Sequence, residues 1–213
     1  MKLIIIACAA IPLLLTGCIA QNYERSAALS SFKDVSYSPW GEGETITAYK
    51  RFMPVTAKNK DSIARCVAKN VANSDIALTG SSSTYVGAST GKIYNFNKES
   101  KTGGGDVIQH ISENGSVIAK GNTDFSFSSD GGLVSVNIEK SVRFTLDVSQ
   151  SDNNGTTFEF TNLATAQKST GYMANGGYDS QGIVAMKQLY PEKALRSLDT
   201  IVDGIALCIA QEK

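Results

Sequence analysis

Apolar and polar residues alternate most regularly in the middle of the chain, where the pattern predicts β-strands. The clearest run spans residues 142–148, with one buried face and one wet face. Similar alternation precedes it at residues 134–138 and follows it at residues 158–160. Gly-, Asn- and Asp-rich turns separate the runs at residues 113–115, 129–132 and 152–155. Short links of this kind predict that an antiparallel meander fills residues 76–168.

Two segments place apolar residues at helical spacing instead. Residues 61–73 predict a helix with Asp61 as N-cap, and Pro191 suits the first position of a longer C-terminal helix. Residues 45–55 predict a strand before the first helix. The expected fold class is α+β: one domain, residues 44–213, in which an antiparallel sheet carries a helix near its start and a long C-terminal helix on one face.

The chain begins with Lys2 and an apolar run over residues 3–15, which has the form of a secretory signal and is too short to span a bilayer. The run closes with Leu15-Thr16-Gly17-Cys18, which resembles the lipobox of bacterial lipoproteins. That resemblance implies removal of residues 1–17 and acylation of Cys18, and two or three acyl chains anchor a protein stably. The alternative is an ordinary secreted protein in which Cys18 is incidental.

Ile19, rather than Asp, follows the Cys. In enteric-type bacteria the resemblance then implies the outer membrane, with the domain facing the periplasm. Residues 18–43 have few periodic apolar positions and predict a lipidated Cys followed by a flexible tether. Trp40, the single Trp, is expected to pack where the tether meets the domain; a membrane-interface role is the alternative.

Of the four cysteines, Cys8 leaves with the signal and Cys18 carries lipid, so Cys66 and Cys208 remain. Two thiols in an oxidising compartment are expected to pair, and each lies on the apolar face of its helix. The alternative is two buried free thiols. Removing the first 17 of the 213 residues leaves 196, enough for a sizeable core.

The order of the strand segments after the first helix resembles a bacterial envelope domain of unknown function with a TATA-binding-protein-like, helix-grip sheet. The resemblance covers about residues 60–210, and it departs from the family in a longer break at residues 150–155. It implies no activity. The segments that carry it are Asp106-Val107-Ile108-Gln109-His110-Ile111, Gly115-Ser116-Val117-Ile118-Ala119-Lys120-Gly121, Val142-Arg143-Phe144-Thr145-Leu146-Asp147-Val148 and Phe158-Glu159-Phe160-Thr161-Asn162-Leu163.

Charge and motifs exclude several classes of function. The chain has 20 basic and 20 acidic residues, and removal of the signal takes only Lys2. This balance, without a basic stripe, gives no indication of nucleic-acid binding. Gly87-Ala88-Ser89-Thr90-Gly91 fits a serine hydrolase elbow, but a strand is expected after it where the elbow needs a helix, and His110 is the only His. A hairpin turn is the preferred interpretation, and we expect no cofactor and no metal, since a zinc site needs three or four ligands.

The sequence therefore favours a non-catalytic envelope protein with a structural, docking or assembly role and a protein partner. A sheet edge or the loop at residues 171–182, with Tyr172, Met173 and Tyr178, would form the contact surface. The alternative is a binding module for a small apolar or lipid-like ligand between the sheet and the C-terminal helix, although such residues more often fill a core. The lining would be Phe144, Leu146, Phe158, Phe160, Leu198 and Ile205.

Overall fold

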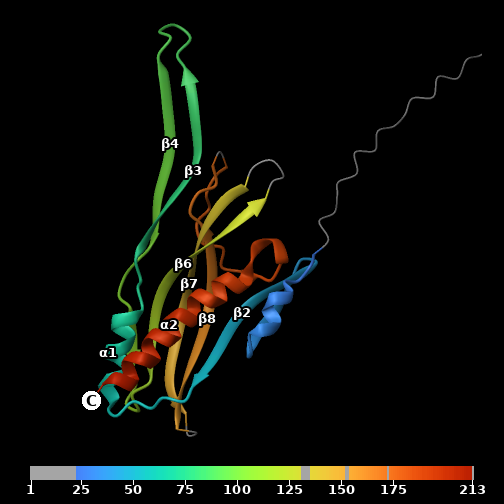
Figure 1. Ribbon diagram of the computed structural model, residues 1–213. Coiled ribbons are helices and arrows are strands. Elements are labelled where there is room, and N and C mark those ends of the chain that lie inside the picture. Colours follow the sequence, from blue (N-terminus) through green and yellow to red (C-terminus); the bar gives the residue numbers. More distant parts are fainter. Residues whose placement is uncertain (1–22, 131–134, 152–153, 172, 213) are drawn as a thin grey trace, which may run out of the picture.

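An antiparallel sheet of seven strands organises the computed structural model, which describes residues 23–130, 135–151, 154–171 and 173–212 (Figure 1). Its strand order is β1-β2-β8-β7-β6-β5, and the short β9 pairs with β2. The strands of the described chain are β1 (Val35–Trp40), β2 (Gly43–Met53), β3 (Asp75–Val86), β4 (Ile93–Gly103), β5 (Ile108–Ile111), β6 (Val117–Asp130), β7 (Ser135–Ser151), β8 (Gly155–Gln167) and β9 (Ile183–Val184).

The predicted meander forms the centre of this sheet. β6, β7 and β8 follow one another in the chain and pair side by side, with Val117 opposite Val148 and Leu146 opposite Phe160. The alternation at residues 142–148 holds: Val142, Phe144, Leu146 and Val148 are buried, and the residues between them lie on the other face. This confirms the α+β class with its open antiparallel sheet.

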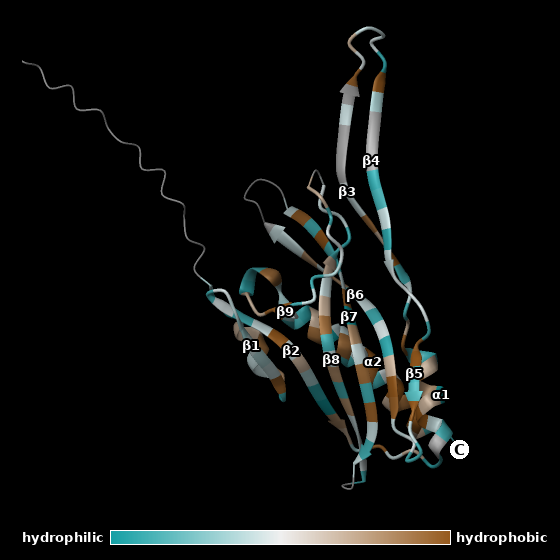
Figure 2. Ribbon diagram, turned by 180° about the vertical axis from the view of Figure 1, so that it is seen from behind, coloured by the Kyte–Doolittle hydropathy of each residue, from teal (hydrophilic) through white to brown (hydrophobic). Residues whose placement is uncertain are grey.

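Two α-helices cover one face of the sheet, α1 (Lys60–Asn70) and α2 (Pro191–Gln211) (Figures 1 and 2). α2 begins at Pro191, as predicted, and buries its apolar stripe against the sheet. The prediction of Asp61 as N-cap of α1 was wrong by two residues. Asn59 takes that place, because its side chain accepts a hydrogen bond from the Ser62 amide at 2.9 Å. No helix in the described part of the chain has both the length and the hydropathy required to cross a membrane.

β3 and β4 depart from the expected single meander. They pair only with each other, and Figure 1 shows them projecting well beyond the main sheet. A small second core holds the base of this ribbon, where Ile76 and Leu78 pack with Ala166 and Tyr178. We call residues 80–98, the part beyond this base, the arm.

The segment expected to be a flexible tether is largely folded. A 3-10 helix, η1 (Ala27–Ser31), places Leu29 in the main core, and β1 pairs with the whole first half of β2. A 3-10 turn followed by a short strand has neither helical nor strand periodicity across its length, which is why the pattern missed it. Only residues 19–22 separate Cys18 from the described domain, and Cys18 itself lies outside the described residues.

Candidate functional site

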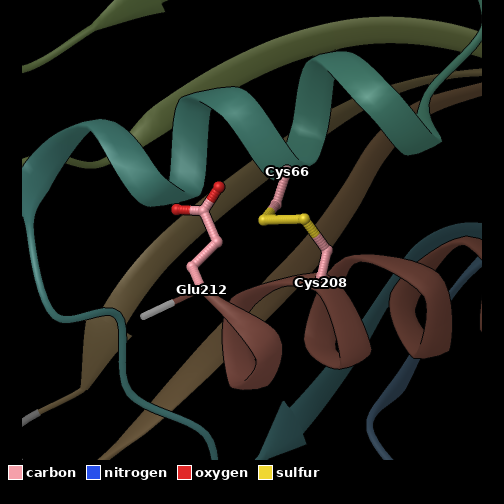
Figure 3. A group of neighbouring side chains, drawn as sticks. All are labelled: Cys66, Cys208 and Glu212. Carbon is pink, nitrogen blue, oxygen red and sulfur yellow. A yellow bond between two sulfur atoms is a disulfide. The ribbon is translucent and has the colours of Figure 1, made fainter.

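The two cysteines left for pairing lie together between the helices. Cys66 on α1 and Cys208 on α2 form a disulfide, with Cα atoms 5.6 Å apart (Figure 3). Glu212 lies beside the sulfur atoms, so that the three side chains resemble a metal-ligand group. Bonded sulfurs are not thiolates, and Glu212 pairs with Arg65 at 3.5 Å. The arrangement therefore ties α1 to α2 and offers no metal site while the bond is intact.

Ser89 does not lie in the setting that a hydrolase nucleophile requires. It belongs to the turn at the tip of the arm, where the Gly87 amide donates to the Lys92 carbonyl and the Gly91 amide to the Gly87 carbonyl, both at 2.8 Å. β4 follows this turn, whereas a nucleophile elbow leads into a helix. His110 is exposed on β5, an edge strand of the main sheet. In Figure 2 the strand β5 lies far from the tip of the arm.

The six side chains predicted to line an apolar ligand cavity are all in the main core. Each is at most 1% exposed, and Phe144 packs edge-on against Phe160 with ring centroids 5.2 Å apart. Phe144 also reaches the wall of a surface pocket of about 510 Å³ whose other lining includes Lys120 and Arg143. The six residues are Phe144, Leu146, Phe158, Phe160, Leu198 and Ile205. Their observed contacts are those of a packed sheet–helix interface.

A polar cleft of about 500 Å³ lies between η1, β2 and α2. Within it, the Tyr49 hydroxyl donates to Asp199 Oδ1 at 2.6 Å. Arg51 pairs with two acidic residues of α2, at 3.0 Å with Asp199 and at 2.9 Å with Asp203. The network joins an inner strand of the sheet to the polar edge of the long helix.

Burial and the charges of this network shift the pKa values of two of its groups, Tyr49 and Arg51. Burial, and then the hydrogen bond to Asp199, raise the pKa of Tyr49 far above its usual value. Burial lowers the pKa of Arg51, but the carboxylates of Asp199 and Asp203 outweigh it and raise that pKa overall. Tyr49 thus stays protonated and Arg51 charged, so both act as fixed donors and neither is suited to accept a proton.

The sequence analysis missed this network. Asp199 and Asp203 stand four residues apart on α2, which puts them on one helical edge, but Arg51 lies 148 residues before Asp199. The spacing of the two Asp residues could have been recognised in the sequence. Their partner Arg51 on β2 could not, because the pairing depends on how the helix crosses the sheet.

The arm carries a group of exposed apolar side chains. Near its tip, Val86, Ile93 and Tyr94 are 65%, 67% and 45% exposed. Val86 and Ile93 are directly paired across the two strands. Exposed large apolar side chains grouped in this way mark contact surfaces.

Backbone hydrogen bonds fix the base of the arm to the sheet. The Thr79 amide donates to the Lys168 carbonyl at 2.8 Å, and the Thr170 amide donates to the Thr79 carbonyl at 3.1 Å. Asn175 Nδ2 donates to the Gln167 carbonyl at 2.8 Å and to the Thr79 carbonyl at 3.3 Å. The arm therefore projects from a defined place and in a defined direction.

The loop predicted as a contact surface packs against this base through Tyr178. Tyr178 is half-buried, donates to Ser141 Oγ at 3.1 Å and lies 4.6 Å beneath the Arg143 guanidinium. Met173 is exposed, and Tyr172 lies outside the described residues. Trp40 ends β1 and donates through Nε1 to Gln181 of the same loop.

No protein-family model matches the chain, and no curated protein matches it. Among solved structures, the fold is similar to that of a DUF4468 family protein from Bacteroides ovatus, with a TM-score of 0.43 and 9% sequence identity. The alignment covers 82% of this chain and 93% of that one.

Proposed function

We propose that the protein is a lipid-anchored, non-catalytic docking protein of the bacterial cell envelope, and that the arm is its contact element. Export and anchoring rest on the signal-like apolar run and on Cys18. The docking role rests on the arm.

The observation that carries the proposal is the combination of a fixed base and an apolar tip. A two-stranded ribbon is marginally stable alone in water, so a long one that leaves the sheet with Val86, Ile93 and Tyr94 exposed is suited to gain contacts from a partner. The hydrogen bond between Thr79 at the base of the arm and Lys168 after β8 would transmit that contact to the whole domain.

The chemical groups of the described residues support a role without catalysis. The polar cleft holds Tyr49, Arg51 and Asp199 in mutual hydrogen bonds and ion pairs. Ser89 and His110 belong to separate elements, and the paired cysteines are bonded to each other. The cleft residues and the disulfide hold elements of the fold together.

A photo-crosslinking amino acid placed at Ala88, in the arm's turn, tests the docking role in cells. We expect it to capture an envelope component, while the same probe at Leu207, exposed on α2, does not. Equal labelling from both positions would contradict a contact through the arm.

Fractionation tests the anchor separately. Cys18→Ala is expected to move the protein from the membrane fraction to the soluble fraction. An intact mass for the native protein without acyl chains would contradict the lipoprotein assignment.

A further inference from the structure

We infer that the partner of the arm is the same lipid bilayer that holds the acylated Cys18, so that the chain attaches to one membrane at two points. This inference rests on the proposed lipid anchor and names the partner of the proposed contact element.

The chain enters the domain at the end of the sheet from which the arm projects. Tyr23 packs against Gly43, where an added Cβ would lie 2.1 Å from its ring, so the described chain begins beside the start of β2. β2 runs antiparallel to β8, with Tyr49 opposite Phe160, which sets Gly43 level with the end of β8. Lys168, the next residue after β8, holds Thr79 at the arm base.

Figures 1 and 2 show the same relation. The arm continues past the sheet on the side where the described chain begins, and the C-terminus lies at the opposite end. A lipid anchor upstream of Tyr23 would therefore bring the end that bears the arm toward the membrane.

The lengths of the two connections are compatible with simultaneous contact. Five peptide steps separate Cys18 from Tyr23 and span at most about 17 Å. Val86 lies seven residues beyond Thr79, and a strand of that length spans about 23 Å. With the arm upright and its base level with Tyr23, the tip extends about 6 Å past the full reach of the connection to Cys18, so both contact the bilayer when the tip enters its interfacial region.

The chemistry of the tip suits the bilayer interface. Val86 and Ile93 supply exposed aliphatic side chains, and Tyr94 supplies the amphipathic ring that is enriched at membrane surfaces. Within residues 80–98 the charged residues are Lys92 and Lys98, and there is no Asp or Glu. Such a segment is attracted to anionic headgroups, and the nearest acidic residue in the chain, Glu99, lies opposite Thr79 at the base of the arm.

Tryptophan fluorescence can test this contact in the lipidated full chain. Trp40 is the only Trp, so Tyr94→Trp in a Trp40→Phe background reports from the arm alone. The protein is reconstituted into vesicles of phosphatidylethanolamine and phosphatidylglycerol, with or without brominated phosphatidylcholine. The matched control carries Leu207→Trp in the same background, on exposed surface near the C-terminal end of α2.

We expect blue-shifted emission and strong quenching by the brominated lipid for Tyr94→Trp, and neither for Leu207→Trp. Adding Val86→Ser and Ile93→Ser should reduce the quenching at position 94 to the control level. Both residues lie outside the two buried clusters, so these changes leave the core intact.

The outcomes separate this inference from the docking proposal. A protein that floats with the vesicles but shows no quenching at position 94 overturns membrane contact. If the probe at Ala88 then captures a protein, the docking role stands with a protein partner. A native chain that carries no acyl group on Cys18 overturns both.

Discussion

Arg51 on the sheet forms ion pairs with two acidic residues of the long helix. It pairs with Asp199, which is 26% exposed, and with Asp203, which is 58% exposed. We expect Asp199→Asn to lower the free energy of unfolding by about 1–2 kcal/mol, because it removes a partly buried charge that two neighbours use. Asp203→Asn should cost less than about 1 kcal/mol, as exposed pairs do. Urea unfolding measures both, and equal losses would contradict this ranking.

Tyr49 gives the same network a pH dependence. Its pKa is raised in the folded protein by burial and by Asp199, so above pH of about 10 the unfolded chain loses a proton that the folded chain keeps. The contribution of Tyr49 to stability is complete below that pH and declines above it. Tyr49→Phe should therefore flatten the loss of stability between pH 9 and pH 11 in urea titrations. An unchanged slope would show that other groups cause it.

Residue-scale chemistry was partly readable in the sequence. Cys66 and Cys208 could be paired because few thiols remained and both fell on apolar helical faces. The pairing of Arg51 with Asp199 could not be predicted, because neither charge is unusual in its own segment. Only the crossing of α2 over β2 brings the guanidinium and the carboxylate to 3.0 Å.

The two helices form an element-scale unit because the disulfide joins them. Cys66 and Cys208 are separated by 142 residues, and closing a loop of that size stabilises the fold by about 4–5 kcal/mol in the chain-entropy model. Cys66→Ala with Cys208→Ala should lose most of this in chemical denaturation. Reduced wild-type protein is the control, since it lacks the bond but keeps both side chains. A loss below about 1 kcal/mol in both would contradict the model.

α1 rests on β6 at a position that has no room for a side chain. A Cβ on Gly121 would lie 2.5 Å from Val71 Cγ1 and 2.8 Å from Phe144 Cζ. Gly121→Ala should therefore destabilise the fold by about 1–3 kcal/mol through overpacking. Gly176→Ala is the matched control, because a Cβ there meets nothing within 4 Å. Thermal unfolding of the two variants compares them, and equal melting temperatures would show that α1 shifts freely.

The regular elements were predicted better than the way in which they pair and pack. The period-two run in β7 and the stripe of α2 follow from one buried face each, which periodicity reports directly. The departure of β3 and β4 from the meander does not, because a strand in a free ribbon and a strand in a sheet share the same local conformation. Contacts distant in sequence hold the ribbon at its base, such as the packing of Leu78 with Ala166, across 88 positions of the chain.

At the scale of the whole molecule, the folded start of the domain changes what anchoring means. A tether over residues 18–43 would let the domain turn freely, but the described domain begins at Tyr23 and leaves four residues between it and Cys18. Short connections raise the effective concentration of one contact once the other is made. In the proposed arrangement, the anchor and the arm at one end of the sheet would act together to orient the domain.

This coupling predicts the effect of a longer connection. Inserting twenty Gly and Ser residues between Asn22 and Tyr23 lengthens the span from five to twenty-five peptide steps, and the effective concentration of the arm at the bilayer should fall roughly tenfold. Brominated-lipid quenching in the Tyr94→Trp protein should fall accordingly, while the fraction of protein floating with vesicles stays unchanged because the acyl chains remain. A rigid helical insert of equal residue number is the control for chain length alone. Unreduced quenching with the flexible insert would mean that the arm binds lipid by its own affinity, independently of where Cys18 is held.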